Sequence, residues 1–308
     1  MTIDRTADLT GHRYVVTGGT GGLGYWASEQ LAAAGATVVI AARSAEKGEA
    51  AMASLRSQVR NADVSFLRLD LADLSSVAEA AEELAALPRI DALIANAGVL
   101  STRGRTETAD GFETMMGTNF LGHFALIGRV LPALRARGGG RVVHLGSISH
   151  EFFRLDLDDL QSTRTPFREF RTYGRSKLAV MTYAFELDRR LRLAGADVAS
   201  IVAHPGFAVD ELSPARRILP EPKEGNPVSR GAYHLIAQGK DAGAHPIVAA
   251  ATDPAAAGGQ YWGPDGWRQL RGAPAVVSAK PYARDPAIAG RLWAAASSLT
   301  GVSPDLPA

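Results

Sequence analysis

Short apolar runs alternate with longer amphipathic stretches along the first two-thirds of the chain. The apolar runs, rich in β-branched residues, are 13–17, 37–42, 64–69, 90–95, 141–145 and 197–202. The stretches with helical spacing of apolar positions are 22–34, 45–59, 74–87, 111–135 and 170–193. Nearly continuous apolar strands separated by helices are typical of a parallel sheet covered on both faces. The pattern predicts a doubly wound α/β fold with three α/β/α layers.

The last third of the chain has a different pattern. Residues 213–227 contain four prolines among charged residues, which predicts a surface loop or lid. Residues 259–263 are predicted to form a last strand, which brings the expected sheet to about seven strands. Residues 264–308 are broken up by Gly and Pro and form a C-terminal extension with one helix near 287–299. No internal repeat is present, so we expect one domain spanning 1–308.

Composition excludes several classes of partner. The net charge is +1, from 33 Lys+Arg against 32 Asp+Glu, so no nucleic-acid partner is expected and a small-molecule ligand is favoured. The chain has no cysteine, which rules out disulfides and thiolate chemistry. The histidines show no metal-ligand spacing, so no metal is expected. The longest apolar run, 31–42, is too short to span a bilayer, and no secretory signal is visible. We therefore expect a cytoplasmic protein.

A glycine-rich turn, Thr17–Gly24, follows the first predicted strand and opens the first helix. Glycines at such a turn let the backbone approach a pyrophosphate, whose charge is met by the helix N-terminus. The turn therefore predicts a Rossmann-type dinucleotide site. The candidate cofactor-binding residues here are Gly18, Thr20, Gly22, Leu23 and Gly24.

The end of the second strand indicates which dinucleotide binds. An NAD enzyme places an acidic residue there, on the ribose 2′-hydroxyl, but this chain has Arg43. A guanidinium binds a 2′-phosphate through charge-assisted hydrogen bonds. We therefore expect NADP(H) in preference to NAD(H), the alternative being that Arg43 is a solvated arginine at a helix start.

Two further strand ends carry candidate cofactor contacts. Asp70 and Leu71 end the third strand, where a short carboxylate can accept from the adenine amino group. Asn96, Ala97 and Gly98 end the fourth strand and offer a floor of small residues for a ribose. Taken alone, each is also compatible with an ordinary structural turn.

Tyr173 and Lys177 lie four residues apart in a predicted helix. Residues at this spacing share one helix face, so the phenol and the ammonium can reach a common ligand. A neighbouring cation favours the phenolate and is expected to lower the pKa of the tyrosine. Because such pairs are frequent by chance, this pair gains meaning from the cofactor site.

The order and spacing of these motifs resembles the short-chain dehydrogenase/reductase family, over about residues 8–212. The residues that carry the resemblance are Gly18, Gly22, Gly24, Asn96, Gly98, Asn119, Ser147, Tyr173, Lys177, Pro205 and Gly206. The amino-acid sequence at 110–113, 118–124 and 176–178 is most similar to the branch of retinol dehydrogenases and light-dependent protochlorophyllide reductase. That branch implies a lipophilic carbonyl or alcohol as substrate.

The resemblance implies roles for four catalytic residues. Tyr173 would be the general acid/base, and Lys177 would lower its pKa and hold the nicotinamide ribose. Ser147 would orient the substrate oxygen, with Ser149 as the alternative serine. Asn119 would position a water and Lys177 in a proton relay. Members of the family are often homodimers or homotetramers, although the C-terminal extension could block the usual packing surface.

One position departs from the family pattern. Pro205 and Gly206 match the loop that packs near the nicotinamide, but Asp210 stands where a Thr or Ser often bonds the carboxamide. A carboxylate accepts hydrogen bonds and cannot donate one to the amide oxygen.

These observations predict an NADP-dependent oxidoreductase that interconverts a ketone or aldehyde and an alcohol by hydride transfer. Two alternatives stay open. One is reduction of an activated C=C bond, or dehydration, on the same scaffold. The other is a regulatory protein that binds the cofactor without catalysis.

Overall fold

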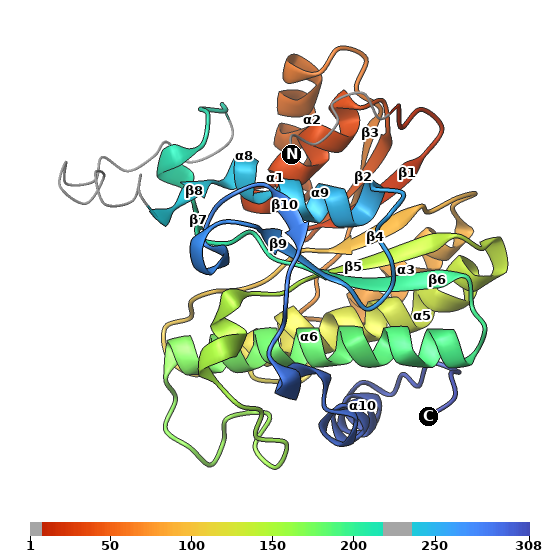
Figure 1. Ribbon diagram of the computed structural model, residues 1–308. Coiled ribbons are helices and arrows are strands. Elements are labelled where there is room, and N and C mark those ends of the chain that lie inside the picture. The colour runs from red at the N-terminus through yellow and green to blue at the C-terminus, as the bar shows by residue number, and fades with distance from the viewer. Residues whose placement is uncertain (1–7, 218–235) are drawn as a thin grey trace.

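A mostly parallel sheet forms the centre of the molecule (Figure 1). The structure, a computed structural model, describes residues 8–217 and 236–308. Within these residues the main sheet has eight strands in the order β10-β9-β6-β5-β4-β1-β2-β3. Their bounds are β1 (Arg13–Thr17), β2 (Thr37–Ala42), β3 (Val64–Arg68), β4 (Ala92–Ala95), β5 (Gly140–Leu145), β6 (Val198–Ala203), β9 (Tyr261–Pro264) and β10 (Pro274–Val276).

Seven of these strands run parallel, and β10 alone pairs antiparallel, with β9. The predicted fold class is therefore confirmed, with one edge strand more than the sequence indicated. This strand is three residues long and begins with Pro274, a residue that strands accept only at edges or first positions. A short two-stranded sheet, β7 (Ala208–Val209) with β8 (Gln238–Gly239), lies outside the main one.

Helices cover both faces of the sheet (Figure 1). One face carries α1 (Gly22–Ala33), α2 (Ala45–Gln58) and α9 (His245–Thr252), and the other carries α3 (Leu74–Ala86), α5 (Gly122–Arg137) and α6 (Glu169–Leu193). Alternate residues of each strand enter the two cores: Val16 and Ile40 pack on one side, Val15 and Val39 on the other. Burial on both faces explains why these strands are apolar at nearly every position.

The strand order reverses between β1 and β4, since the chain builds β2 and β3 on one side of β1 and then crosses to β4 on the other. Ligands of open α/β sheets bind outside the carboxyl ends of the strands at such a switch point. The turn after β1 and the Asn96–Gly98 segment after β4 both lie there.

The helix expected over 111–135 begins later, at Thr114, ends at Arg137 and is interrupted. Gly111 has φ +79°, which no α-helix allows, and the Glu113 carboxylate caps the next turn by accepting from Met115 N and Met116 N at 2.9 and 2.7 Å. The helical stretch therefore begins as α4 (Thr114–Met116), widens into a π-helical turn η1 (Gly117–Leu121) and continues as α5. Asn119 lies on the π-helical turn, a feature often found at functional sites.

The C-terminal extension packs back on the body of the protein. It contains η4 (Trp267–Gln269), β10, η5 (Pro281–Arg284) and the expected helix, α10 (Pro286–Thr300). The Trp293 ring lies 5.6 Å from Phe124 of α5 and 5.5 Å from Tyr183 of α6. Of the predicted loop 213–227, residues 218–227 lie outside the described residues. Over 8–217 and 236–308, no helix combines the length and apolarity that crossing a membrane requires.

Candidate active site

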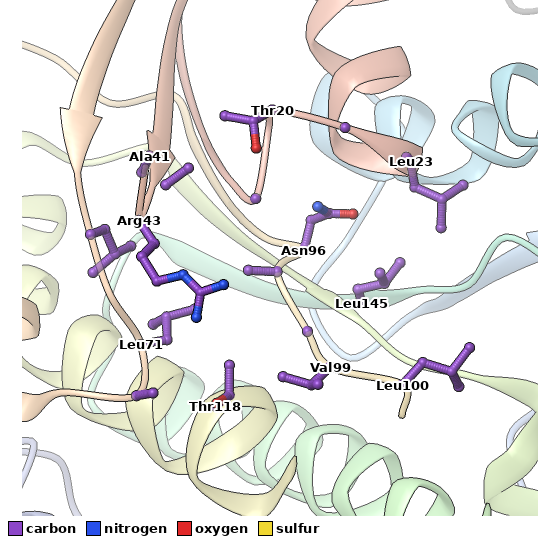
Figure 2. A pocket seen from close by; sticks show the side chains of 18 of the residues that line it. Thr20, Leu23, Ala41, Arg43, Leu71, Asn96, Val99, Leu100, Thr118 and Leu145 are labelled. Carbon is purple, nitrogen blue, oxygen red and sulfur yellow. The ribbon is translucent and has the colours of Figure 1, made fainter. Parts of the chain in front are cut away.

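A cleft of about 660 Å³ opens at the carboxyl ends of β1 to β5 (Figure 2). It brings together most of the cofactor residues expected from the sequence with the catalytic pair on α6. The expected residues that line it are Gly18, Thr20, Gly22, Leu23, Arg43, Asp70, Leu71, Asn96, Ala97, Gly98, Tyr173 and Lys177. Gly24, Asn119, Ser147, Pro205 and Gly206 lie outside this lining.

The glycine turn is clamped to the end of β4. The Thr17 hydroxyl accepts from Asn96 N and Ala97 N, both at 2.9 Å, and Asn96 Nδ2 donates to Thr17 O at 2.8 Å. A Cβ on Gly18 would lie 2.9 Å from the Ala97 Cα, and one on Gly24 would lie 2.4 Å from Gly18 O. Side chains at these two positions would push the turn off β4. Within the described part of the chain no side chain caps α1, and its first residues line the cleft, so their N–H groups are available to an anion.

Two cations lie where β2 ends. Arg43 is exposed and points into the cleft (Figure 2), and Lys47 of α2 lines the same wall. Sequence reasoning missed Lys47, although its position one helical turn after Arg43 was a usable signal. At the end of the neighbouring strand β3, Asp70 accepts from Ala72 N at 3.0 Å through Oδ1.

Lys177 is almost fully buried, with 4% of its surface exposed. Its Nζ donates to Leu145 O at 2.9 Å, at the end of β5, and lies 5.9 Å from the centre of the Tyr173 ring. Burial lowers the pKa of Lys177 to about 8, because the interior disfavours the charged form.

Tyr173 is partly buried, and its phenol lies close to the Ser147 side chain. Burial raises the pKa of Tyr173, and the neighbouring Ser147 hydroxyl opposes that rise. The lowering of the Tyr173 pKa expected from the Tyr–Lys spacing is therefore not found, because the lost hydration of the phenolate is the largest effect.

The geometry separates the two candidate serines. Ser147 Oγ accepts from Ser149 N at 3.1 Å and caps the turn η2 (Ile148–Phe152), while also meeting the Tyr173 phenol. The Ser149 hydroxyl is buried and has no hydrogen-bond partner among the described residues. The serine that lies against the phenol is thus Ser147.

His150 holds the turn that begins at Ser147 in place through two hydrogen bonds. It is fully buried, its Nδ1 donates to Ser147 O at 2.7 Å, and its Nε2 accepts from Lys280 N at 3.3 Å. Burial lowers the pKa of His150, which keeps the ring neutral and fits this pair of bonds. Sequence reasoning could not find this contact, because Lys280 lies 130 residues further along the chain.

Asn119 is tied to the strand end beside it. Its Oδ1 accepts from Val99 N at 2.6 Å, and its Nδ2 donates to Val99 O at 3.0 Å and Ser176 Oγ at 2.9 Å. Its side chain therefore fixes the segment after β4 next to Gly98 and close to Lys177.

Asp210 does not stand free next to the Pro205–Gly206 loop. Its Oδ2 accepts from Lys240 Nζ at 2.6 Å. Lys240 opens the short helix α8 (Lys240–Gly243) and lines the cleft, and no sequence motif pointed to it.

Three apolar side chains are exposed in the cleft or on segments linked to it. Leu100 lines the cleft and is 63% exposed; Phe152 and Phe170 lie outside the lining and are 67% and 57% exposed. Glu169 ties these segments together by accepting from the Ser101 hydroxyl at 2.5 Å and from Thr102 N at 2.9 Å. The Phe153 ring lies 5.3 Å from Phe170. Phe152 and Phe170 belong to the segment 151–171 between Ser147 and Tyr173.

Comparison with known proteins agrees with this arrangement. Residues 13–215 match the short chain dehydrogenase family. The chain is 35% identical to human retinol dehydrogenase 13 over 303 residues, covering 96% of this chain and 86% of that protein. It is 38% identical to mouse polyprenol dehydrogenase over 295 residues, covering 93% and 83%. A crystal structure of an uncharacterised Mycobacterium paratuberculosis protein superposes with a TM-score of 0.79 at 32% identity, covering 98% of this chain and 97% of that one.

The site and fold define an oxidoreductase that acts on CH–OH or C=O groups. The chain belongs to the short-chain dehydrogenase/reductase family and is similar to its retinol dehydrogenase branch.

Proposed function

We propose that this protein is an NADP-dependent oxidoreductase that interconverts a lipophilic ketone or aldehyde and its alcohol, with Tyr173 as general acid/base. One observation carries the proposal. Tyr173, close to Ser147 and flanked by Lys177, stands at the end of the cleft whose other parts include the glycine turn and Arg43. A phenol, a hydroxyl and an ammonium thus meet beside a site built for a dinucleotide.

The residues present fit this cofactor. The uncapped start of α1 and the glycine turn would hold the pyrophosphate. Arg43, with Lys47, would bind the 2′-phosphate, and Asp70 and Leu71 would border the adenine. Asn96, Ala97 and Gly98 would support the ribose, while Pro205 and Gly206 would lie near the nicotinamide. When bound, the nicotinamide supplies the hydride.

The chain's own groups supply and steer the proton. In reduction the carbonyl carbon gains the hydride and the Tyr173 phenol gives its proton to the substrate oxygen, which becomes the hydroxyl of the alcohol. Ser147 donates a hydrogen bond to the same oxygen and orients it. Lys177 holds the ribose hydroxyls and favours the phenolate that remains, which in oxidation takes the proton from the alcohol. Asn119 keeps the segment beside Lys177 in place.

The apolar border of the cleft supports a lipophilic substrate. Leu100 lines the cleft, and Phe152 and Phe170 lie on segments linked to it; all three expose apolar surface that an apolar ligand would cover. The names of the relatives, retinol dehydrogenase and polyprenol dehydrogenase, refer to long apolar alcohols and support the same class.

A screen of ketones, aldehydes, enones and alcohols with NADPH and NADP tests the proposal, followed by mass analysis of product formed from NADPH deuterated at the transferable position. We expect one deuterium on the carbinol carbon. Deuterium on the carbon β to a carbonyl would instead support C=C reduction. Tight binding of NADPH with no turnover over a broad panel would favour the regulatory alternative.

A further inference from the structure

Lys240 lies beside the glycine turn although it comes from a distant part of the chain. It lines the cleft, and a Cβ built on Gly22 would lie 3.7 Å from its Nζ. Gly22 is the first residue of α1, whose first N–H groups have no side-chain cap. The Lys240 ammonium therefore stands next to the end of α1 where a pyrophosphate would sit.

The lysine is fixed in place by contacts on several sides. Its Nζ donates to Asp210 Oδ2 at 2.6 Å, and its backbone N donates to Ser213 Oγ at 2.7 Å. Helix α8 is also bound to α1, since Gln30 Nε2 donates to Asp241 O at 2.8 Å. A Cβ on Gly243 would lie 3.1 Å from Leu23 Cδ2, which shows how closely α8 packs on the start of α1. An ammonium held in this way loses little freedom when it binds a ligand.

The ammonium retains donors for an anion. An ammonium has three donors, and Asp210 takes one of them. Among residues 8–217 and 236–308, Asp210 is the one hydrogen-bond partner of the ammonium, and the side chain is 25% exposed and lines the cleft, so two donors can reach an anion there. The other lining cations come from elsewhere: Arg43 and Lys47 from the end of β2 and the start of α2, and Lys177 from α6.

We propose that Lys240 binds the pyrophosphate of the dinucleotide and completes an anion site with the glycine turn and the start of α1. The inference rests on the proposed cofactor site and adds to it a residue outside the family motifs. Asp210 acts as the positioning residue for this ammonium. Because the pyrophosphate is common to both dinucleotides, Lys240 strengthens binding of NADPH and NADH alike, whereas Arg43 acts on NADPH.

Fluorescence titration of the full-length protein with NADPH and NADH, and calorimetry with 2′-AMP, test this role. Lys240→Met removes the charge, Lys240→Arg keeps it, and Lys280→Met is the matched control. The Lys280 side chain is 47% exposed, is paired with Glu151 and lies outside the cleft lining. If Lys240→Met does not fold by circular dichroism, Lys240→Gln takes its place, since an amide can still bond Asp210 without charge.

Loss of a charge-assisted bond predicts that Lys240→Met raises the Kd of both dinucleotides by the same factor, roughly five- to thirtyfold. We expect Lys240→Arg and Lys280→Met to stay close to the wild type, and 2′-AMP, which lacks a pyrophosphate, to bind all variants equally. Kd values for both dinucleotides within about twofold of the wild type, or an equal loss for 2′-AMP, would overturn the inference. A wild-type protein that binds neither dinucleotide would instead refute the proposed cofactor site.

Discussion

The buried Lys177 predicts an unusual dependence of stability on pH. Its pKa falls from 10.5 in the unfolded chain to about 8 in the folded protein, because burial disfavours its charge. Between these two values the unfolded state binds more protons, so the free energy of unfolding rises with pH. The full effect is about 3 kcal/mol, of which about 2 kcal/mol develops between pH 7 and pH 9.5.

Urea unfolding of the cofactor-free protein at pH 7, 8.5 and 9.5 measures this effect, with Lys177→Met as the reference. Methionine has a similar length and no titrating group. Burial also raises the pKa values of Tyr14 and Tyr25 to about 12, but they affect both proteins equally and cancel in the difference. We expect the stability of the wild type relative to Lys177→Met to increase by about 2 kcal/mol from pH 7 to pH 9.5. Parallel pH profiles would refute a lysine buried with a lowered pKa.

Two further substitutions test the cofactor preference and the C-terminal extension. Arg43→Ala is expected to raise the Kd of NADPH by about tenfold and to change the Kd of NADH by less than about twofold. Tenfold is in the lower part of the range for a charge-assisted pair, because Arg43 is exposed. Equal losses of affinity for both dinucleotides in fluorescence titration would contradict a role of Arg43 at the 2′-phosphate. Trp293→Ala should lower the free energy of unfolding in urea by about 3–5 kcal/mol, since Trp293 is 6% exposed and packs on Phe124 and Tyr183. The exposed Leu299 on the same helix provides the control, and a cost for Trp293→Ala no larger than for Leu299→Ala would show that α10 contributes little.

The fold followed from the sequence because each central strand is buried on both faces. Val15 and Val16 pack in opposite cores, so consecutive positions of the strand are apolar. A strand or helix with one face in solvent has polar residues at some of these positions. The parts that sequence reasoning missed have no such pattern. Strand β10 is three residues long and begins with Pro274. The π-helical turn around Asn119 leaves the apolar spacing of the helix almost unchanged, so periodicity alone predicted one continuous helix.

The candidate site also contains some residues that the sequence predicts and others that it does not. Residues at the carboxyl ends of parallel strands come together because the sheet geometry requires it, so Gly18, Arg43 and Asn96 meet at one cleft as expected. The contacts of Lys240 and His150 depend on how distant segments fold back on that edge, which local spacing does not encode. The Tyr–Lys spacing could not predict the direction of the Tyr173 pKa shift, because that shift depends on how far the folded protein removes water from the phenol.

In the proposed reaction Tyr173 moves the proton that accompanies hydride transfer at this cleft. Single-turnover reduction of the best carbonyl substrate from the screen, with saturating NADPH, compares the wild type with Tyr173→Phe. Phenylalanine keeps the ring and removes only the hydroxyl that lies close to Ser147. We expect unchanged NADPH binding and a rate lower by about 10²–10⁴-fold, the usual contribution of a general acid. A Tyr173→Phe protein that reduces the substrate at the wild-type rate would contradict this role of Tyr173.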